Sequence, residues 1–536
     1  MLKKFLTSVE DLDSPKFFLL ISIGVIILVY LPFLIKGGFI IDDWGVVYTA
    51  NQSHSLISNF LGWFPLFSNR PFAPILLVIT SNLFGLNPQP YILINLLLVL
   101  GFLSITGITM EKFMGRLFSF LFVVIGAVPI IATTVIFSPV MQITATASLF
   151  LWAVSLWCLY KYTKLQDKKY YLFTYALILI ALLVYEVILP LLALTFFLPF
   201  IISKKDIGPV NQKLRYLLRY GVPMAVILGV IYVYQKLIMP HFMIVYSRFH
   251  PFNPFTHLST VHRIEAAWID SVINVPIQMV KDLFASGLSK LSPVALLLEI
   301  VFLVGVTTLI ILKNKKVATG HSISSFTVIL ITFLSGSVLF LLSNSIANTF
   351  GYYNRGLSTS WFGLALLLAF FGSLPRKYFL TVLTLVLTLL SWSVFSLERD
   401  SYIRSYQTQL VTINEVIQLA RQNNAQKGAF ILGDLPATLP GSFHGEDFFY
   451  NPWDFGESLN IYSNGQIAGG DTLTAQKVSL GMVSSNKDAV TLDGYWQVSY
   501  KDLWFYSFDF KTSQPAMTRI SNWDDFKKIE QTLDGS

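Results

Sequence analysis

The chain alternates between long apolar runs and short polar connections. Apolar runs occupy residues 17–35, 91–110, 117–136, 140–160, 171–187, 188–203, 220–238, 292–312, 323–343, 357–374 and 378–396. An α-helix needs about 20 predominantly apolar residues to cross a bilayer, and most of these runs come close to that length. The pattern predicts an all-α polytopic membrane protein with about eleven transmembrane helices.

The composition agrees with a membrane protein. Of the 536 residues, 54% are hydrophobic and 13% are charged, whereas a soluble domain carries about 25% charged residues. The start Met1-Leu2-Lys3-Lys4 with the first run resembles a signal peptide, but the run is long and no small-residue cleavage site follows. We therefore expect an uncleaved membrane anchor. The single cysteine, Cys158, excludes a disulfide framework and a cysteine metal site.

The basic residues predict the orientation of the helices. Cytoplasmic loops of membrane proteins are enriched in lysine and arginine. Five clusters fall on one side if the stretch from Pro71 to Gly85, about 15 residues, is a re-entrant or interfacial helix too short to span. The clusters are Lys112/Arg116, Lys161/Lys164/Lys168/Lys169, Lys204/Lys205/Lys213/Arg215/Arg219, Lys313/Lys315/Lys316 and Arg376/Lys377. The N-terminus is then cytoplasmic and the C-terminus external, and the net charge of +8 reflects topology and not binding to nucleic acid.

Two parts of the chain differ in composition. Residues 1–396 form the predicted transmembrane module, with external segments at 36–90 and 239–291. Residues 397–536 form an external tail of soluble composition, for which we expect a small α/β or irregular domain. Its first element is a predicted amphipathic helix carrying Ile403, Leu410, Ile413, Ile417 and Ala420 on one face. A predicted strand, Ala429-Phe430-Ile431-Leu432, follows and ends at Gly433-Asp434.

An acidic pair, Asp42-Asp43, follows the first apolar run and carries the strongest functional signal. Charge is costly at membrane depth, so a carboxylate pair in an apolar setting indicates a functional site. The alternative is that these are two solvated loop acids at a helix end. The chain has no phosphate-binding loop, dinucleotide fingerprint or His-Glu-x-x-His motif, so nucleotide hydrolysis, Rossmann cofactors and zinc proteolysis have no support.

Other isolated polar residues stand at the predicted outer ends of the apolar helices. They are Asn69, Arg70, Gln142, Glu186, Asn344, Asn348, Tyr353, Asn354 and Arg355. A common depth on one side predicts a single site at the membrane–water boundary. The guanidinium of an arginine can bind phosphate oxygens through two hydrogen bonds. Three of these residues also have a structural interpretation: Arg70 as a snorkelling anchor, Glu186 as a hydrogen-bond partner of helix ends, and Arg355 as part of an interfacial belt.

The four histidines of the second external segment, His241, His250, His257 and His262, fit no metal template by spacing. We therefore predict no resident cofactor and no metal site, although the aspartate pair has ligands that suit a divalent cation.

The order of these motifs resembles the GT-C superfamily of integral-membrane glycosyltransferases, which includes protein O-mannosyltransferases and lipid A aminoarabinose transferases. In that superfamily an acidic pair opens the first external loop. Three further stretches resemble its later blocks: Asn69-Arg70-Pro71-Phe72-Ala73-Pro74 with Leu83-Phe84-Gly85, Tyr185-Glu186, and Tyr353-Asn354-Arg355-Gly356. The resemblance covers roughly residues 15–375. Gln142 departs from it, since some members have an acidic residue there.

The resemblance implies transfer of a sugar from a polyprenyl-phosphate donor to an acceptor hydroxyl on the outer face of a bacterial plasma membrane. Asp42 or Asp43 would be the general base, with Asp42 favoured. Arg70 and Arg355 would bind the lipid phosphate, and Asn69, Gln142, Glu186 and Tyr353 would contact substrate. The acceptor would be a cell-envelope glycan, lipid or protein. Two other classes stay open: a transporter or flippase of lipid-linked glycans, and a non-catalytic envelope assembly protein.

Overall fold

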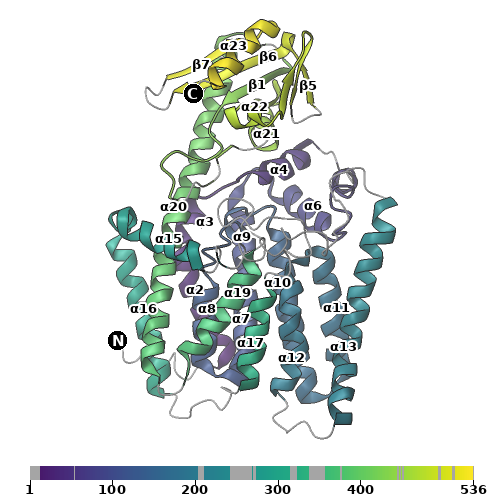
Figure 1. Cartoon of the computed structure of the whole chain (residues 1–536), viewed down its shortest axis with the longest axis vertical. Helices are drawn as coiled ribbons and strands as arrows, with labels where there is room; N and C mark the ends of the chain where they lie inside the picture. The colour runs from purple at the N-terminus through teal and green to yellow at the C-terminus, as the bar shows by residue number, and fades with distance from the viewer. Residues whose placement is uncertain are drawn as a thin grey trace.

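The computed structural model describes residues 13–52, 55–202, 210–241, 269, 273–313, 323–336, 357–374, 377–425, 427–443, 446, 448–449, 452–492, 496–509 and 514–534. These residues form a bundle of helices with a smaller mixed domain above one end (Figure 1). The helix α20, Tyr378–Gln422, joins the two parts.

The bundle consists of helices of very different lengths. Its elements are α2 (Ser14–Val25), η1 (Ile26–Tyr30), α3 (Leu31–Lys36), α4 (Asp42–Gln52), α5 (Leu56–Trp63), α6 (Ala73–Phe84), α7 (Pro88–Met114), α8 (Arg116–Gly126), α9 (Thr134–Phe137), α10 (Ile143–Leu165), α11 (Lys168–Val184), η2 (Glu186–Leu191), α12 (Leu192–Ile202), α13 (Val210–Val233), η3 (Tyr234–Ile238), η4 (Met239–His241), α15 (Val275–Asp282), η7 (Leu283–Gly287), η8 (Leu288–Lys290), α16 (Pro293–Lys313), α17 (Ile323–Ser335) and α19 (Ser358–Gly372).

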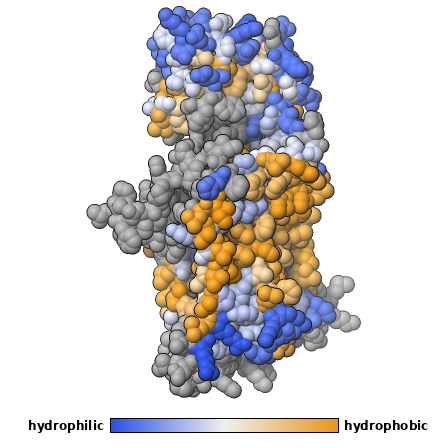
Figure 2. Space-filling view, turned by 90° about the vertical axis from the view of Figure 1, so that its right-hand side faces the viewer, coloured by the Kyte–Doolittle hydropathy of each residue, from blue (hydrophilic) through white to orange (hydrophobic). Residues whose placement is uncertain are grey.

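Five helices of the described residues are long and apolar enough to cross a membrane. They are Ser14–Lys36, Pro88–Met114, Ile143–Leu165, Pro293–Leu312 and Tyr378–Gln422. Shorter apolar helices, among them Glu186–Pro199, Leu218–Val233 and Ser358–Gly372, cover parts of other predicted spans. A hydrophobic belt lies between two hydrophilic ends of the molecule (Figure 2). The fold is thus mostly helical and compatible with a membrane protein, while the number of eleven spans stays a prediction.

The predicted span at 117–136 is not a continuous helix. Helix α8 ends at Gly126, and only the short α9 follows before residue 138. Pro129 explains the break, because proline removes a backbone donor and disfavours a helical residue before it. Two indole N–H groups donate to carbonyls at the end of α8: Trp392 to Val124, and Trp361 to Ile125, which also accepts the N–H of Val128. Irregular backbone at this depth is tolerated because it is buried in protein and satisfied by side chains.

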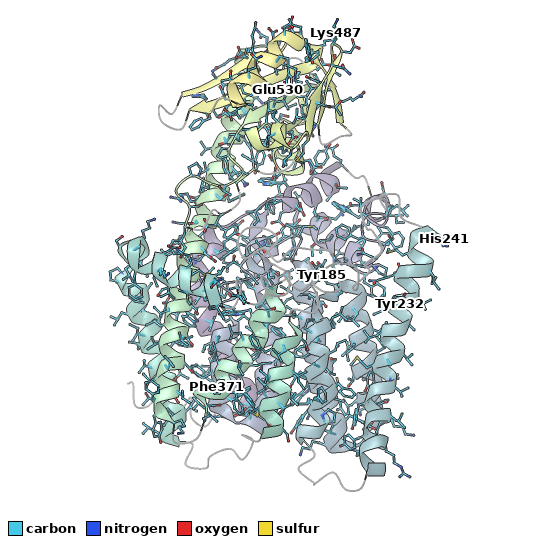
Figure 3. All side chains as sticks on the ribbon, viewed as in Figure 1. Tyr185, Tyr232, His241, Phe371, Lys487 and Glu530 are labelled. Carbon is cyan, nitrogen blue, oxygen red and sulfur yellow. The ribbon has the colours of Figure 1, made fainter. Side chains whose placement is uncertain are left out.

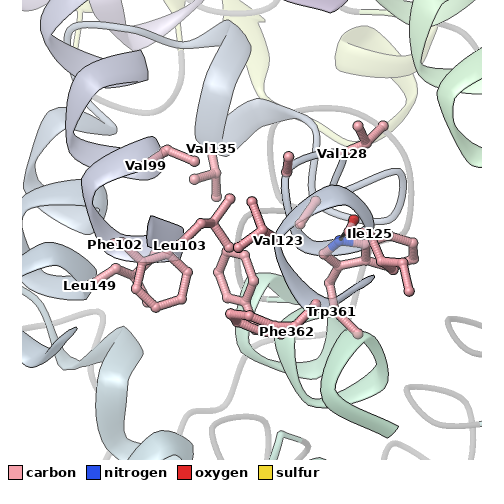
Figure 4. Packing of buried hydrophobic residues seen from close by; sticks show 14 of the residues in the cluster. Val99, Phe102, Leu103, Val123, Ile125, Val128, Val135, Leu149, Trp361 and Phe362 are labelled. Carbon is pink, nitrogen blue, oxygen red and sulfur yellow. Dashed lines mark hydrogen bonds between the residues drawn. The ribbon is translucent and has the colours of Figure 1, made fainter. Parts of the chain in front are cut away.

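The same broken segment belongs to the largest hydrophobic core. Val123 and Ile125 of α8 belong to the same core as Phe102 of α7 and Phe362 of α19, and Figure 4 shows Ile125 beside Trp361. The Phe102 and Phe362 rings meet edge to face with centroids 4.7 Å apart. The broken segment is therefore held by the packing of large buried rings and branched aliphatic side chains.

The segment between the first two long helices contains three short helices, of which the sequence predicted only one. The predicted re-entrant element corresponds to α6, whose 12 residues span about 18 Å of helix axis, less than the roughly 30 Å hydrocarbon core of a bilayer. Helices α4 and α5 precede it and were not expected. Figure 1 places α4 and α6 at the end of the bundle that faces the C-terminal domain.

Helix α20 is longer than predicted. The last apolar run and the amphipathic segment that follows it form one continuous helix of 45 residues, about 67 Å in length. Ile413 and Ile417 of its upper half are buried in a second core shared with α4 and the domain. The predicted boundary at residue 397 therefore falls inside a helix, and one rigid element connects bundle and domain.

The C-terminal domain is α/β, one of the two alternatives expected for the tail. A four-stranded sheet has the order β2-β1-β6-β7, in which β2, β1 and β6 are parallel and β7 is antiparallel. The predicted strand is β1 (Ala429–Asp434). A second, antiparallel sheet has the order β3-β4-β5. The other elements are α21 (Pro452–Tyr462), β2 (Ile467–Thr472), α22 (Ala475–Ser479), β3 (Val483–Ser485), β4 (Ala489–Leu492), β5 (Trp496–Ser499), η10 (Tyr500–Asp502), β6 (Leu503–Asp509), β7 (Gln514–Arg519) and α23 (Trp523–Asp534).

Candidate functional site

The acidic pair lies on a strained turn. Ile41, directly before it, has a φ of +43°, an unfavourable backbone conformation for a β-branched residue. Backbone N–H groups of Asp43 and Trp44 donate to the carbonyls of Ile40 and Ile41 and close the turn. Strain of this kind persists only where surrounding contacts impose it, and it often accompanies a functional site. The turn places Asp42 and Asp43 at the start of α4.

Asp43 is fully buried and its carboxylate is saturated with donors. Oδ1 accepts from Ser138 Oγ at 2.9 Å and from the backbone N–H groups of Val140 at 3.1 Å and Met141 at 2.9 Å. Oδ2 accepts the N–H of Ile40 at 3.2 Å. Burial raises the pKa of Asp43 to about 7, although these donors lower it. Asp43 thus connects the strained turn to the chain that leads into α10.

Asp42 has a different environment. It is only partly buried, and it faces acidic residues of the C-terminal domain, since α21 packs on α4. Burial, together with the charges of Asp454 and Asp42, raises the pKa of Glu457 on α21 to about 8. A protonated Glu457 is therefore expected beside Asp42 at neutral pH. Sequence patterns did not predict this neighbour, because its position depends on the contact between two distant helices.

Two further hydrogen bonds attach α4 to the elements above it. Trp44 Nε1 donates to Gln409 Oε1 of α20 at 3.1 Å, and Gln52 Nε2 donates to Asn460 Oδ1 of α21 at 3.4 Å. Gln409 is fully buried and also donates to the carbonyl of Phe448. The acidic pair thus lies at the junction of bundle and domain.

Arg70 and Glu186 form a bidentate ion pair, although 116 residues separate them. Arg70 Nε lies 2.6 Å from Glu186 Oε2, and Arg70 Nη2 lies 2.5 Å from Glu186 Oε1. The guanidinium also stacks on the ring of Tyr185, with its Cζ 4.0 Å from the ring centroid. Tyr185 is half-buried, and Figure 3 places it in the half of the bundle nearer the C-terminal domain. The structure therefore brings two of the predicted site residues into direct contact.

The start of α10 joins this ion pair to the acidic pair. Residues 138–141 bind Asp43, and Ser148 Oγ lies 2.9 Å from the carbonyl of Ala181 and 2.8 Å from that of Tyr185. Ser148 follows Gln142, the N-cap of α10, by six positions, a rise of about 9 Å. Gln142, between the two groups, is 2% exposed, and its Oε1 has no hydrogen-bond partner among the described residues. An unsatisfied buried oxygen is costly, so Gln142 is a candidate for contact with a ligand.

No family model, curated protein or solved structure matches this chain.

The remaining predicted residues stand as follows. The Asn69 carbonyl accepts from Gln235 Nε2 of η3 at 3.4 Å, and the adjacent Ser68 carbonyl accepts from the Tyr234 hydroxyl at 2.6 Å. Five of the predicted site residues lie outside the described residues, namely Arg355, Tyr353, Asn344, Asn348 and Asn354. Three of the four histidines also lie outside them, namely His250, His257 and His262. His241 is exposed at the outer edge of the bundle (Figure 3). Among the described residues, no group of three or more histidine, cysteine or acidic side chains is arranged to hold a metal ion.

Proposed function

We propose that this chain is a GT-C-like glycosyltransferase that moves a sugar from a polyprenyl-phosphate donor to an acceptor hydroxyl. The observation that carries the proposal is the unequal environment of two adjacent carboxylates. Asp43 is buried and held by four donors, whereas Asp42, on the same strained turn, remains partly exposed. Such a pair supplies one rigidly positioned acid and one reactive acid.

Asp42 is the base in this mechanism. It accepts the proton of the acceptor hydroxyl as that oxygen attacks the anomeric carbon of the donor. The bond between that carbon and the phosphate oxygen breaks, the bonding electrons stay on the phosphate, and polyprenyl phosphate leaves. Asp43 is a positioning residue that holds the turn bearing Asp42.

Arg70 stabilises the phosphate that leaves. Glu186 fixes the guanidinium through two hydrogen bonds and Tyr185 supports it from one face, so the cation is pre-organised and needs no rearrangement during the reaction. Arg355 and Tyr353 remain part of the proposal by resemblance, and Gln142 and Asn69 are proposed to contact substrate. On the predicted topology, the reaction takes place on the outer face of the membrane, beneath the C-terminal domain.

The test is transfer by the purified protein from a polyprenyl-phosphate sugar to a cell-envelope acceptor fraction. Asp42→Asn keeps the shape of the side chain but removes the base, and we expect a loss of about 10² in rate. Asp524→Asn is the matched control, because Asp524 is an exposed acid in the first turn of another helix, α23. Arg70→Ala should raise the KM for the donor. Full activity of the Asp42→Asn protein would refute the mechanism.

One observation favours the alternative, a transporter or flippase of lipid-linked glycans. Glu299 of the apolar helix α16 is 3% exposed and borders, with Arg399 of α20, a cavity of about 110 Å³. Buried ionisable residues between apolar helices are typical of transport pathways. Vesicles that hold a fluorescent lipid-linked glycan distinguish the two functions: movement between leaflets that is abolished by Glu299→Gln, with no sugar transfer, would favour transport.

A further inference from the structure

A hollow of about 550 Å³ opens on the bundle at the end opposite the C-terminal domain. It lies between the C-terminal end of α10, the first turn of α11 and α13, and it is lined by Tyr162, Lys168, Lys169, Tyr171, Leu172 and Arg219. No residue proposed for catalysis borders it. The end of the bundle where it opens is hydrophilic, below the hydrophobic belt (Figure 2).

The charge in the hollow is predominantly positive. Lys168, Lys169 and Arg219 supply three cations, and the only acid bonded to them among the described residues is Asp167, 3.0 Å from Lys169 Nζ. The Lys168 side chain is exposed and has no hydrogen bond or ion pair with any residue that the structure describes. An anion in the hollow would therefore meet an excess of positive charge.

The placement of the two lysines is unfavourable without an anion. Lys168 and Lys169 occupy the first turn of α11. The positive end of the helix dipole lies there, so basic side chains destabilise the helix. Asp167 compensates in part, because its carboxylate caps the helix by accepting the N–H of Lys169. A bound phosphate would gain from both the dipole and the lysines.

Contacts with Tyr162 and Gln166 fix the position of the Arg219 guanidinium. Its guanidinium donates to the hydroxyl of Tyr162 and to Gln166 Oε1, and it lies over the Tyr162 ring at 4.9 Å. The Tyr171 hydroxyl donates to the Arg219 carbonyl at 2.7 Å, which fixes α13 against α11. Little side-chain entropy is then lost on binding.

The surface beside the hollow is suited to acyl chains. Leu172, which lines it, is 70% exposed, and Leu218 and Val222 of α13, one turn apart, are 54% and 49% exposed. Leu218 precedes Arg219 directly on α13, and Val222 follows Arg219 by three residues. A free phosphate would use only the cations, whereas a phospholipid would use both the cations and this apolar surface.

We propose that this hollow binds the phosphate headgroup of an anionic phospholipid, with the acyl chains lying along α11 and α13. Basic pockets between membrane helices are suited to such headgroups, and each cation near the membrane surface contributes about 1 kcal/mol.

The experiment measures binding of phosphatidylglycerol to the purified full chain in phosphatidylcholine nanodiscs, by native mass spectrometry and by the shift in melting temperature. We expect phosphatidylglycerol to raise the melting temperature, and Lys168→Ala and Arg219→Gln each to weaken its binding about fivefold, the factor that corresponds to about 1 kcal/mol. Lys168→Ala has no described contact to lose, so its effect does not depend on altered folding. Lys164→Ala, an exposed lysine that does not line the hollow, is the matched control and should bind as the unaltered protein does.

Two results would overturn the proposal. One is equal binding of phosphatidylglycerol by the unaltered protein and by the Lys168→Ala/Arg219→Gln double variant. The other is an equal melting shift with inorganic phosphate, which would assign the hollow to a soluble anion. Neither depends on sugar transfer, so this proposal and the proposed function fail independently.

Discussion

Trp44, the residue after the acidic pair, donates its indole N–H to the buried side chain of Gln409, 365 residues later in the chain. This bond joins the turn that carries Asp42 to the long helix α20. Trp44 also stacks on Tyr406 of the same helix, with ring centroids 6.2 Å apart. The geometry at the acidic pair therefore depends on how α20 is placed.

Gln409→Leu tests this dependence. The substitution leaves the buried Trp44 N–H without its acceptor and the Phe448 carbonyl without its donor, and each unsatisfied buried group costs about 1–3 kcal/mol. We expect a lower melting temperature and a lower transfer rate. Gln407→Leu, on the exposed side of the same helix, should change neither. If the Gln409→Leu protein has a normal melting temperature and a normal transfer rate, the hydrogen bond between Trp44 and Gln409 is needed neither for stability nor for activity.

Substitution of Asp43 should destabilise the protein more than substitution of Asp42. Asp43→Ala removes the acceptor of four hydrogen bonds, and we expect a loss of at least about 3 kcal/mol in the free energy of unfolding, given the cost of leaving buried donors unpaired. Asp42→Ala removes a partly exposed acid from the first turn of a helix, where a charge contributes about 1 kcal/mol or less. Denaturant titration of both variants measures the difference. Equal losses would contradict the assignment of Asp43 as the positioning residue.

The sequence predicted the parts of this arrangement that depend on local pattern. The long apolar helices, the short α6 and the strand β1 follow from hydropathy, length and residue type. The acidic pair was recognised because carboxylates are rare beside an apolar run. Those signals lie within one stretch of chain and need no knowledge of its neighbours.

Other features depend on contacts between distant segments and left no local signal. Glu457 belongs to a tail helix whose proximity to Asp42 arises only from the packing of α21 on α4. The break after α8 was missed because apolar character continues through it, and the indoles of Trp361 and Trp392 that satisfy it come from much later helices. The division at residue 397 was placed at a change in composition, but α20 continues through that change without interruption.

Glu457 should make the junction of bundle and domain sensitive to pH. Its pKa is raised from 4.5 to about 8 in the folded protein, so the folded state binds a proton more tightly than the unfolded state. The resulting stabilisation is complete below about pH 4.5 and is lost as the pH rises through about 8. Glu457→Gln carries a permanently neutral side chain and cannot lose this contribution. We expect the melting temperature of the unaltered protein to fall relative to that of Glu457→Gln between pH 5 and 9, and a constant difference would contradict the raised pKa.

Substitution of Gln142 can show whether this residue binds substrate or stabilises the fold. Its buried Oε1 has no hydrogen-bond partner among the described residues, and removing an unsatisfied polar atom relieves a cost of about 1–3 kcal/mol. Gln142→Met keeps the length of the side chain and removes both polar atoms, so we expect unchanged or higher stability. If Gln142 contacts substrate, the same variant should transfer sugar more slowly, with a higher KM. A lower melting temperature would instead identify Gln142 as a structural residue, and unchanged kinetics would remove it from the proposed site. A Gln142→Met protein that is stable but transfers sugar more slowly would support a direct contact between Gln142 and substrate.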